Sequence, residues 1–403
     1  MTVLFGHPTG NPNSHHAALA HFEAGRLEAF CVSWMPSVGC LRLLELVRPL
    51  QSMAQRLRRR YFEPLRRAPL LQDRIGEFTR LIVRSLGFGD ERLSYEANDW
   101  LMRMMRRECR RSSVTAVHAY EDCSFFQFAE AKRLGKACIY DMPIGYYPAW
   151  EDTQAKLARR YEGWFPAGGL RSSRYVRPEQ KKKEMQLADL VLAPSGFVEE
   201  TIRSFHPHKP ITRAAYGVDS AYWCPGVKEN VDRPLRFIYA GQLSLRKGTP
   251  LLLEAWEQAG LPDAELELVG SCQLELRKLS GLPSNVGVIP PCSRESLREH
   301  YRAADVFVFP SFFEGLALVQ LEALACGLPL IASDSGGASE ILDEDCGRVL
   351  PTGDLDALVE ALRWFAENRS RLPVMSRAAR ARAEQCSWDN YRESVSQAVA
   401  GYV

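Results

Sequence analysis

Two glutamates eight residues apart, Glu314 and Glu322, are the side chains in this sequence best placed to act on one ligand. Glu314 precedes Gly315 in a turn that follows an apolar run, Val306–Phe309, typical of a buried strand. Glu322 lies about two helical turns further on, in a helix-like pattern that begins after Gly315. A strand, a glycine turn and a helix start in this order leave free backbone N–H groups that can bind an anion. The stretch therefore predicts a phosphate-binding turn with a carboxylate at each end.

The residues around this pair decide between two interpretations. As an isolated pair, Glu314 and Glu322 would more simply be a loop charge and a solvated helix face. They are embedded, however, in Pro-Ser-x-x-Glu-Gly over 310–315 and Glu-Ala-x-Ala-x-Gly-x-Pro over 322–329, followed by a second apolar run and a Gly-Gly turn. The whole assembly resembles the donor-binding signature of glycosyltransferase family 4, a group of retaining enzymes with the GT-B fold.

The resemblance implies roles for the residues of this stretch. In that family the first glutamate faces the transferred sugar and the second binds the nucleotide ribose, which here would be Glu314 and Glu322. The resemblance also implies donor binding by the residues of the turn, namely Phe313, Gly315, Leu316, Ala317 and Leu318. The implied ligand is a nucleotide diphosphate sugar.

A second glycine turn, Gly241 to Gly248, carries candidate cations for the diphosphate of such a donor. The family has Gly-Arg at the start of this turn and Lys-Gly at its end, and Lys247 matches the second cation. Gln242 stands where the arginine is expected, and Arg246 is the candidate to restore the missing charge. Both cations could instead be solvated loop charges, but the glycine frame favours donor binding. Fixed positive charge is what a departing diphosphate needs.

The composition limits the class of protein. A chain of 403 residues can form about two domains, and 46% apolar and 25% charged residues are typical of globular proteins. A formal charge of +2 gives no global field that would favour nucleic acid. The 11 cysteines are scattered without a Cys-x-x-Cys pair, which predicts neither disulfides nor a zinc site. The first residues lack a signal-peptide pattern and no apolar stretch is long enough to span a bilayer, so we expect a cytoplasmic location.

Alternating strand and helix patterns predict an α/β fold with parallel sheets. The resemblance implies the GT-B fold, in which two Rossmann-like domains face each other across a cleft. We expect an acceptor-side domain at 1–215, a donor domain at 216–386 and, at 387–403, a closing helix that crosses back to the first domain. Within the donor domain the expected strands and helices alternate at 237–240, 249–258, 266–269, 273–279, 286–290, 294–304 and 306–309.

Candidate acceptor-side residues lie in the amino-terminal half. A loop follows the first apolar run, Val3–Phe5, and contains Gly10; just after it come His15 and His16, which are either polar site residues or helix-start residues. Tyr146 lies in an aromatic stretch that suits a sugar or lipid acceptor, although core packing explains the same pattern.

His118 is the candidate catalytic histidine. It lies near the carboxyl end of an expected strand, 114–120, where open α/β sheets place ligand-binding groups. A lone histidine on a strand is often a core residue, but in the resembling family a histidine at the corresponding strand end approaches the sugar. Both interpretations stay open from the sequence.

The segment from Leu41 to Arg67 combines an apolar stripe at three- and four-residue steps with eight arginines. A basic amphipathic helix of this kind can bind the anionic inner face of a membrane reversibly. The alternative is that the stripe packs on the domain while the arginines face water.

Taken together, the motifs predict retaining transfer of a sugar from a nucleotide diphosphate sugar to a glycan, lipid or small-metabolite acceptor. We expect no metal and no other cofactor, because the resemblance implies a surface turn at Asp343-Glu344-Asp345 and no Gly-x-Gly-x-x-Gly follows a strand. Two alternatives stay open. A sugar-nucleotide epimerase has the same architecture, and the missing arginine at Gln242 would also suit an inactive sugar-nucleotide binding protein.

Overall fold

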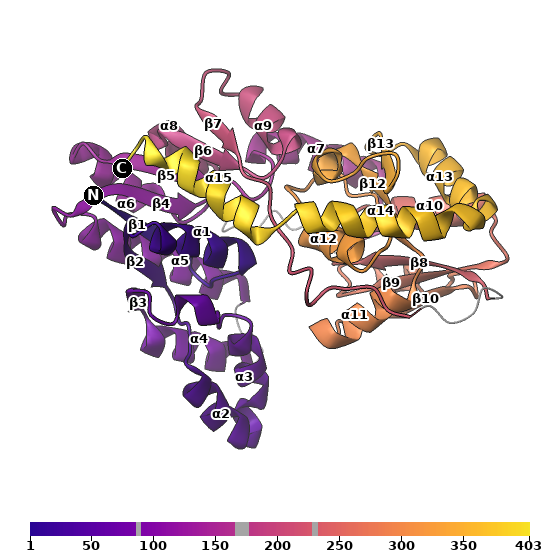
Figure 1. The fold of residues 1–403 in the computed structure, drawn as a ribbon, viewed down its shortest axis with the longest axis horizontal. Helices are drawn as coiled ribbons and strands as arrows, with labels where there is room; N and C mark the ends of the chain where they lie inside the picture. The colour runs from indigo at the N-terminus through magenta and orange to yellow at the C-terminus, as the bar shows by residue number, and fades with distance from the viewer. Residues whose placement is uncertain (86–89, 166–176, 228–232) are drawn as a thin grey trace.

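The computed structural model describes residues 1–85, 90–165, 177–227 and 233–403. The chain forms two β-sheets, each covered by helices (Figure 1). The first sheet has the strand order β3-β2-β1-β4-β5-β6-β7 and the second β10-β9-β8-β11-β12-β13, and the neighbouring strands are parallel. The predicted α/β class with parallel sheets is confirmed.

The first sheet belongs to the amino-terminal domain. Its strands are β1 Thr2–Gly6, β2 Leu27–Val32, β3 Leu70–Gln72, β4 Val114–Tyr120, β5 Ala137–Asp141, β6 Leu190–Ala193 and β7 Ile211–Arg213. The helices around it are α1 Pro12–Glu23, α5 Asp90–Glu108, α6 Phe125–Arg133, α7 Tyr147–Arg160, α8 Pro178–Leu187 and α9 Gly196–Arg203. The central strands are mostly apolar and buried, as parallel strands between two helical layers must be.

The second sheet belongs to the carboxyl-terminal domain. Its strands are β8 Leu235–Ala240, β9 Ala264–Val269, β10 Val286–Ile289, β11 Val306–Phe309, β12 Leu330–Ser333 and β13 Gly347–Leu350. Its helices are α10 Thr249–Ala259, α11 Arg294–Ala303, α12 Leu318–Ala325, α13 Leu355–Glu367 and α14 Leu372–Gln385. The carboxyl ends of these strands carry the turns with the candidate donor residues.

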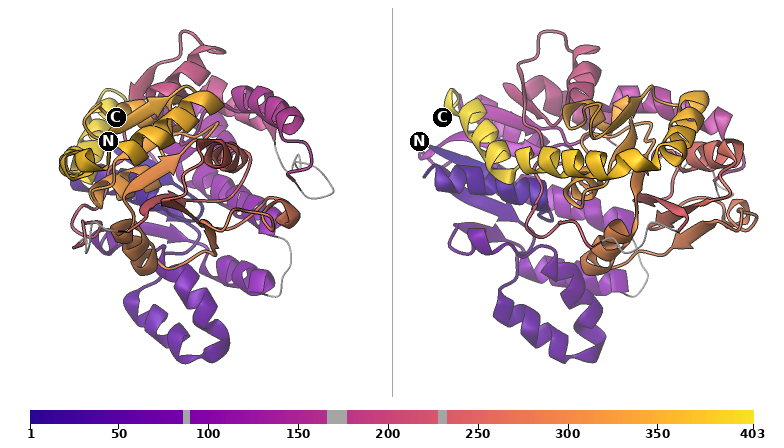
Figure 2. Two further views of the ribbon diagram at one scale, coloured as in Figure 1. Left: turned by 90° about the vertical axis from the view of Figure 1, so that its right-hand side faces the viewer. Right: turned by 45° about the vertical axis from the view of Figure 1, so that its right-hand side comes forward.

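The chain crosses between the two domains twice. The first crossing lies between β7 and β8, where the boundary near residue 215 was expected. At the second, α14 packs on α12 and the final helix, α15 (Trp388–Ala400), packs on α1 (Figure 1). Trp388 stacks on His16 with 4.2 Å between the ring centroids, and Arg392 donates to Glu23 over 2.8 Å. The two termini consequently lie close together on the first domain (Figures 1 and 2).

The arginine-rich segment does not form the single helix that its pattern predicts. Helix α2 (Val38–Leu46) ends where Val47 takes an extended backbone (φ −100°, ψ 105°), and a 3-10 turn at Arg48–Leu50 leads into α3 (Gln51–Arg58). With α4 (Arg74–Ser85) these helices form a projection that stands out from the first sheet (Figures 1 and 2). This helical projection, residues 38–58 and 74–85, has a small core of its own, in which Leu41, Met53, Leu57 and Leu81 pack together with Trp34 from the loop after β2.

The helix expected at 273–279 is also absent; the structure has only a 3-10 turn at Leu276–Lys278. The backbone N–H of Gln273 donates to the carbonyl of Leu243 (2.9 Å), and that of Glu275 donates to the carbonyl of Trp164 (2.9 Å). These two hydrogen bonds hold the backbone of residues 273–275 against neighbouring loops, so these residues do not form the intrahelical bonds of a regular helix.

Candidate active site

The turn that carries Glu314 joins β11 to α12. The backbone N–H of Glu314 donates to the carbonyl of Ser335 (3.0 Å), and the Ser335 hydroxyl donates to the carbonyl of Ser311 (2.9 Å). The side chain of Gln320 donates to the carbonyl of Gly336 (2.7 Å). The Gly-Gly turn after β12 therefore holds the Glu314 turn in shape, which explains why the two motifs occur together.

Gly315 lies where the two domains touch. A Cβ atom at this position would lie 1.9 Å from the carbonyl oxygen of Pro143, so only glycine fits here. The Ser195 hydroxyl donates to the carbonyl of Gly315 (2.8 Å), and Glu340 accepts a hydrogen bond from the backbone N–H of Gly196 (2.7 Å) at the start of α9. The Glu314 turn is thus held against the carboxyl ends of β5 and β6 in the first domain.

The turn after β8 places two cations on Glu314. A Cβ atom on Gly248 (φ 74°) would lie 1.9 Å from a backbone carbonyl oxygen of the loop after β11, so this glycine allows the two turns to approach. Nη1 of Arg246 lies 3.0 Å from Oε2 of Glu314, and Nζ of Lys247 contacts the same oxygen. The structure therefore brings Arg246, Lys247 and Glu314 into one ion cluster, which is largely buried.

Burial affects the charges of this cluster. Burial, followed by the nearby Arg246, lowers the pKa of Lys247 well below its usual value, while contact with the Glu314 carboxylate favours the charged form. Burial also lowers the pKa of Arg246, but an arginine keeps its charge at any physiological pH. Two cations that share one carboxylate leave positive charge available to an anionic ligand.

Glu322 lies two helical turns along α12 and is half-buried. Burial raises the pKa of Glu322 to about 7, although the Arg294 side chain acts in the opposite direction. A carboxyl group with this pKa changes charge near neutral pH and, when ionised, accepts hydrogen bonds from hydroxyl groups such as those of a ribose.

The remaining donor candidates lie in the same two turns. Leu316, Ala317 and Leu318 form the start of α12, where no side chain caps the helix. The backbone N–H of Gln320 donates to the carbonyl of Ala317 (3.0 Å), which leaves the N–H groups of Leu318 and Val319, the first two of the helix, to bind an anion. Gln242 is half-buried in the turn after β8, and its backbone carbonyl accepts a hydrogen bond from Tyr239 (2.8 Å).

Phe313 points into the junction of the domains instead of toward the cations. Its ring packs against Trp150 and Phe197, with 5.4 Å and 5.3 Å between the ring centroids. A Cβ atom on Gly145 would lie 2.5 Å from the Phe313 ring, so glycine is required opposite this ring. Phe313 helps to hold the domains together next to Glu314.

Three of the acceptor-side candidates pack α1 against its neighbours. His15 stacks on Phe62 with 5.1 Å between the ring centroids, and His16 stacks on Trp388 of α15. Burial lowers the pKa of His15 to about 4 and that of His16 to about 3, so both rings are neutral at physiological pH. Gly10 (φ 70°) lies against the His15 ring. Within the described ranges no hydrogen bond joins these residues to the Glu314 turn.

Tyr146, the fourth acceptor-side candidate, belongs to the loop that meets Gly315, but its side chain is buried in the first domain. Its hydroxyl lies 3.2 Å from Nε2 of His206, and its backbone N–H donates to Thr201 (2.9 Å). The geometry gives Tyr146 a packing role beside α9.

The structure places His118 in the core of the first domain and not on the surface of the cleft. Its side chain is fully buried, with Nδ1 2.9 Å from Nε2 of His21 and Nε2 3.6 Å from Oδ2 of Asp141. It lies two residues before the end of β4, so the strand end itself is occupied by Tyr120. The geometry supports a positioning role for His118, because its enclosed ring has no exposed surface for a sugar.

Sequence reasoning missed Tyr120 and Asp141, which are the last residues of β4 and β5. The rule that ligands bind at the carboxyl ends of parallel strands would have selected both.

A cavity of about 790 Å³ opens between the domains next to Phe313. Its walls come from α7, α9 and the turns after β11, β12 and β13; its charged lining residues are Lys156, Arg160, Arg213, Glu200, Asp334 and Glu340. Arg246, Lys247 and Glu322 do not line it, so it adjoins the ion cluster without containing it. Three basic and three acidic side chains balance, which suits a neutral polar ligand better than an anion.

Comparison with known proteins agrees with this geometry. Residues 226–382 match the family model described as glycosyl transferases group 1. The matched residues include both glycine turns and both glutamates of the carboxyl-terminal domain. The resemblance stated from the sequence is confirmed.

Curated relatives share mainly this domain. The GDP-mannose-dependent monoacylated alpha-(1-6)-phosphatidylinositol monomannoside mannosyltransferase of Corynebacterium glutamicum is 37% identical over 157 residues, which are 36% of this chain and 41% of that protein. The D-inositol 3-phosphate glycosyltransferase of Pseudarthrobacter chlorophenolicus is 31% identical over 239 residues, which are 53% of this chain and 57% of that protein. The matches thus span less than two thirds of these relatives.

Solved structures show the fold of the whole chain. Sucrose-phosphate synthase from Thermosynechococcus elongatus superposes with a TM-score of 0.67 at 16% identity and covers 98% of both chains. HepE of Anabaena in complex with UDP superposes with a TM-score of 0.63 at 15% identity and covers 100% of both chains. The GT-B fold predicted from the resemblance is confirmed.

Proposed function

We propose that this chain is a retaining glycosyltransferase that moves a sugar from a nucleotide diphosphate sugar to a hydroxylated acceptor. The observation that carries the proposal is the ion cluster, because Arg246 and Lys247 converge on the turn of the family's first glutamate. Arg246 supplies a second cation although Gln242 stands in the usual arginine position. This favours an active enzyme over an inactive binding protein.

The cluster suggests how the donor binds. The diphosphate takes the place of the Glu314 carboxylate on Arg246 and Lys247, with the free N–H groups at the start of α12 as further donors. Glu322 accepts hydrogen bonds from the ribose. Glu314, released from the cations, then turns to the sugar.

The fixed charges suit the transfer step. The acceptor oxygen forms a bond to the anomeric carbon on the face from which the diphosphate leaves. The electrons of the broken carbon–oxygen bond stay on the diphosphate, and the hydroxyl proton passes to its departing oxygen. Arg246 and Lys247 stabilise the charge that develops there, so we propose that no metal ion is needed.

The acceptor enters through the cavity beside Phe313. This cavity is lined by both domains, adjoins the Glu314 turn and carries hydroxyl groups from Thr153, Ser335, Ser339 and Thr352. Its balanced charge favours a neutral, hydroxylated group as the part of the acceptor that binds.

We also propose that the helical projection contacts the anionic inner face of a membrane. In the part of the chain that the structure describes, no helix has the length and hydrophobicity to cross a bilayer. Leu43 and Leu46 of α2, however, are 67% and 80% exposed, and Arg42 and Arg48 lie beside them. Exposed leucines next to arginines match the physics of shallow insertion into anionic lipid.

Incubation with donor sugars tests the enzymatic proposal. The chain is first titrated with UDP, GDP and ADP while its melting temperature is recorded, since a ligand of the folded state raises it. The sugar nucleotide of the stabilising base is then supplied with and without candidate acceptors. Glycosylated product with retained anomeric configuration supports the proposal. Release of an epimer from the donor alone would instead identify an epimerase.

A further inference from the structure

A group of polar side chains is buried where the first domain meets the two crossings of the chain. It consists of Asn13 on α1, Tyr120 at the end of β4, Asp141 at the end of β5, Tyr216 in the first crossing and Tyr391 on α15. The rings of Tyr216 and Tyr391 lie 5.7 Å apart. All five side chains are at least nine-tenths buried. We call this group the junction cluster.

The hydrogen-bonding capacity of the junction cluster is largely unused. Tyr120 approaches Tyr391 and Tyr216 approaches Asn13, but in the described part of the chain Oδ1 of Asn13 and all three hydroxyls lack a hydrogen bond of ordinary geometry. Native proteins rarely leave several buried polar groups unpaired in one place. The cluster is therefore built to receive polar groups from a ligand.

A chain of side chains leads from Arg26 through His21 and His118 to Asp141. Nε of Arg26 donates to Nδ1 of His21 (3.4 Å), so the proton of the neutral His21 ring lies on Nε2, 2.9 Å from Nδ1 of His118. His118 then carries its own proton on Nε2, which faces Oδ2 of Asp141 over 3.6 Å. Arg26 also donates to Ser396 of α15 (2.9 Å), which anchors the chain of side chains to the final helix.

His21 stays neutral, because burial, followed by the neighbouring His118 and Arg26, lowers its pKa well below the usual value. Among the described residues no lysine or arginine forms an ion pair with Asp141. A buried carboxylate without a cation partner has acceptor capacity left for hydroxyl groups.

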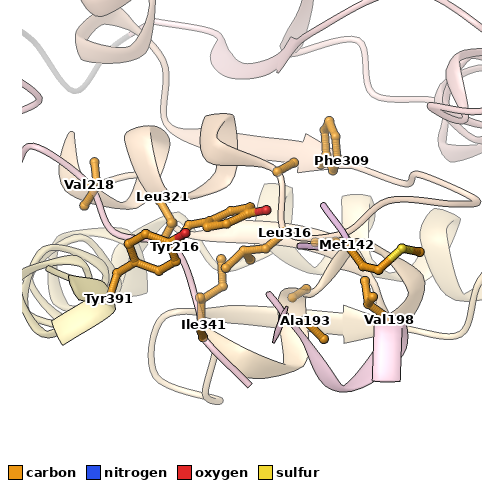
Figure 3. Close-up of a cluster of buried hydrophobic side chains, with 14 of the residues drawn as sticks. Met142, Ala193, Val198, Tyr216, Val218, Phe309, Leu316, Leu321, Ile341 and Tyr391 are labelled. Atoms are coloured by element: carbon orange, nitrogen blue, oxygen red, sulfur yellow. The ribbon is translucent and has the colours of Figure 1, made fainter. Parts of the chain in front are cut away.

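The junction cluster borders the turn that the proposed donor occupies. Asp141 lies two residues before Pro143, whose carbonyl oxygen touches Gly315. Figure 3 shows Tyr216 and Tyr391 beside Leu316 and Leu321, the residues at and after the start of α12. A sugar attached to a diphosphate at this helix start would face the cluster.

We propose that the junction cluster binds hydroxyl groups of the transferred sugar, that Asp141 accepts a hydrogen bond from one of them, and that His118 and His21 position Asp141. The inference rests on the proposed function, and it names residues of the first domain that select the sugar. Three phenol hydroxyls, one amide and one carboxylate offer both donors and acceptors, which is what a sugar ring requires.

Calorimetric titration of the full chain with UDP, UDP-glucose, GDP, GDP-mannose, ADP and ADP-glucose tests the inference. The quantity compared is the Kd of the sugar nucleotide divided by the Kd of the same nucleoside diphosphate without the sugar. Asp141→Asn should raise this ratio about tenfold or more, since a hydrogen bond to a charged group is lost, and Tyr391→Phe should raise it about threefold or more. The Kd of the nucleotide alone should stay within about twofold, because the cluster does not touch it.

Two matched variants serve as controls. Asp189→Asn removes a carboxylate whose Oδ2 accepts from the backbone N–H of Cys138 (2.8 Å) at the other end of β5, and Tyr161→Phe removes a buried hydroxyl at the end of α7. Both should leave the ratio unchanged. Thermal unfolding of every variant separates loss of fold from loss of sugar recognition.

The positioning role of His118 has its own readout. His118→Ala should raise the Kd ratio as Asp141→Asn does. His118→Gln should raise the ratio less than His118→Ala, because an amide can donate to Asp141. If the ratio were the same in the wild type and in both His118 variants, His118 would have a packing role only and would not position Asp141.

The outcomes separate the inference from the proposed function. If none of the six compounds binds the wild type, the proposed function and the inference fail together. If they bind and Asp141→Asn keeps the wild-type ratio, the proposed function stands, the inference is overturned, and the junction cluster holds ordered water only.

Discussion

Nη1 of Arg246 lies 3.0 Å from Oε2 of Glu314, and this contact joins the two glycine turns of the carboxyl-terminal domain. Lys247 contacts the same carboxylate oxygen. The acid of one turn thus occupies the cations of the other, and an incoming diphosphate competes with Glu314 for them. This competition makes Glu314 and Lys247 respond in opposite ways to substitution.

Glu314→Ala should lower turnover by about 100-fold or more, because a group that faces the transferred sugar is lost. The affinity for the preferred nucleoside diphosphate should stay the same or rise, because Arg246 and Lys247 are freed from their internal carboxylate. Steady-state kinetics and calorimetry measure the two effects. Weaker nucleotide binding with unchanged turnover would reverse the assigned role.

Glu322→Ala should weaken nucleotide binding by about tenfold or more, because a charge-assisted hydrogen bond to the ribose is worth roughly 1.5–3 kcal/mol. Glu344→Ala, an exposed acid of the Asp343–Asp345 turn, is the matched control and should bind like the wild type. Calorimetry with the preferred nucleotide measures the affinity of both variants. Equal affinity of both variants would remove Glu322 from the donor site.

The raised pKa of Glu322 predicts a pH-dependent stability. Its pKa is about 7 in the folded chain and 4.5 as a free side chain, so the folded state binds the proton more tightly. The stabilisation is complete below pH 4.5 and is lost as the pH rises through 7. Glu322→Gln should therefore gain stability over the wild type at pH 8 by about 1–3 kcal/mol, and much less at pH 5. Denaturant titrations at both pH values measure this; an equal difference at both would contradict a buried, proton-binding Glu322.

The helical projection should bind anionic vesicles through α2. Each arginine near such a surface is worth about 1 kcal/mol and is screened by salt, while Leu43 and Leu46 insert. In sedimentation assays the double variant Leu43→Ser, Leu46→Ser should lose most of the binding seen at low salt. Val374→Ser, which changes another exposed apolar residue on α14, should not. Wild-type binding to neutral and anionic vesicles alike, or to neither, would leave the arginines as a solvated face.

The strand, turn and helix that carry Glu314 and Glu322 could be predicted from the sequence because their signals are local. The apolar run, the glycines and the two glutamates follow one another along a single strand, turn and helix, and β11 and α12 lie where the pattern places them. Arg246 could be suggested from its neighbour Lys247, but its contact with Glu314 depends on how closely two separate turns approach.

The first domain was harder to predict, because its polar residues are arranged by tertiary contacts. His118 has the pattern of a site residue, yet its ring is enclosed between His21 and Asp141. The arginine-rich segment has the periodicity of one helix, yet it folds as a projection with its own core. The junction cluster combines side chains that are up to 378 positions apart in the sequence, from Asn13 to Tyr391, so no local pattern points to it.

The central claim is that Arg246 and Lys247, drawn together at the Glu314 turn, hold the diphosphate of a nucleotide donor. Calorimetric titration of the wild type, Lys247→Ala and Gln242→Arg with UDP, GDP and ADP tests it most directly. One of the three nucleotides should bind the wild type. Lys247→Ala should bind this nucleotide at least about tenfold more weakly, and Gln242→Arg should bind it equally or more tightly. Wild-type affinity in Lys247→Ala would contradict the claim and place the phosphate site elsewhere.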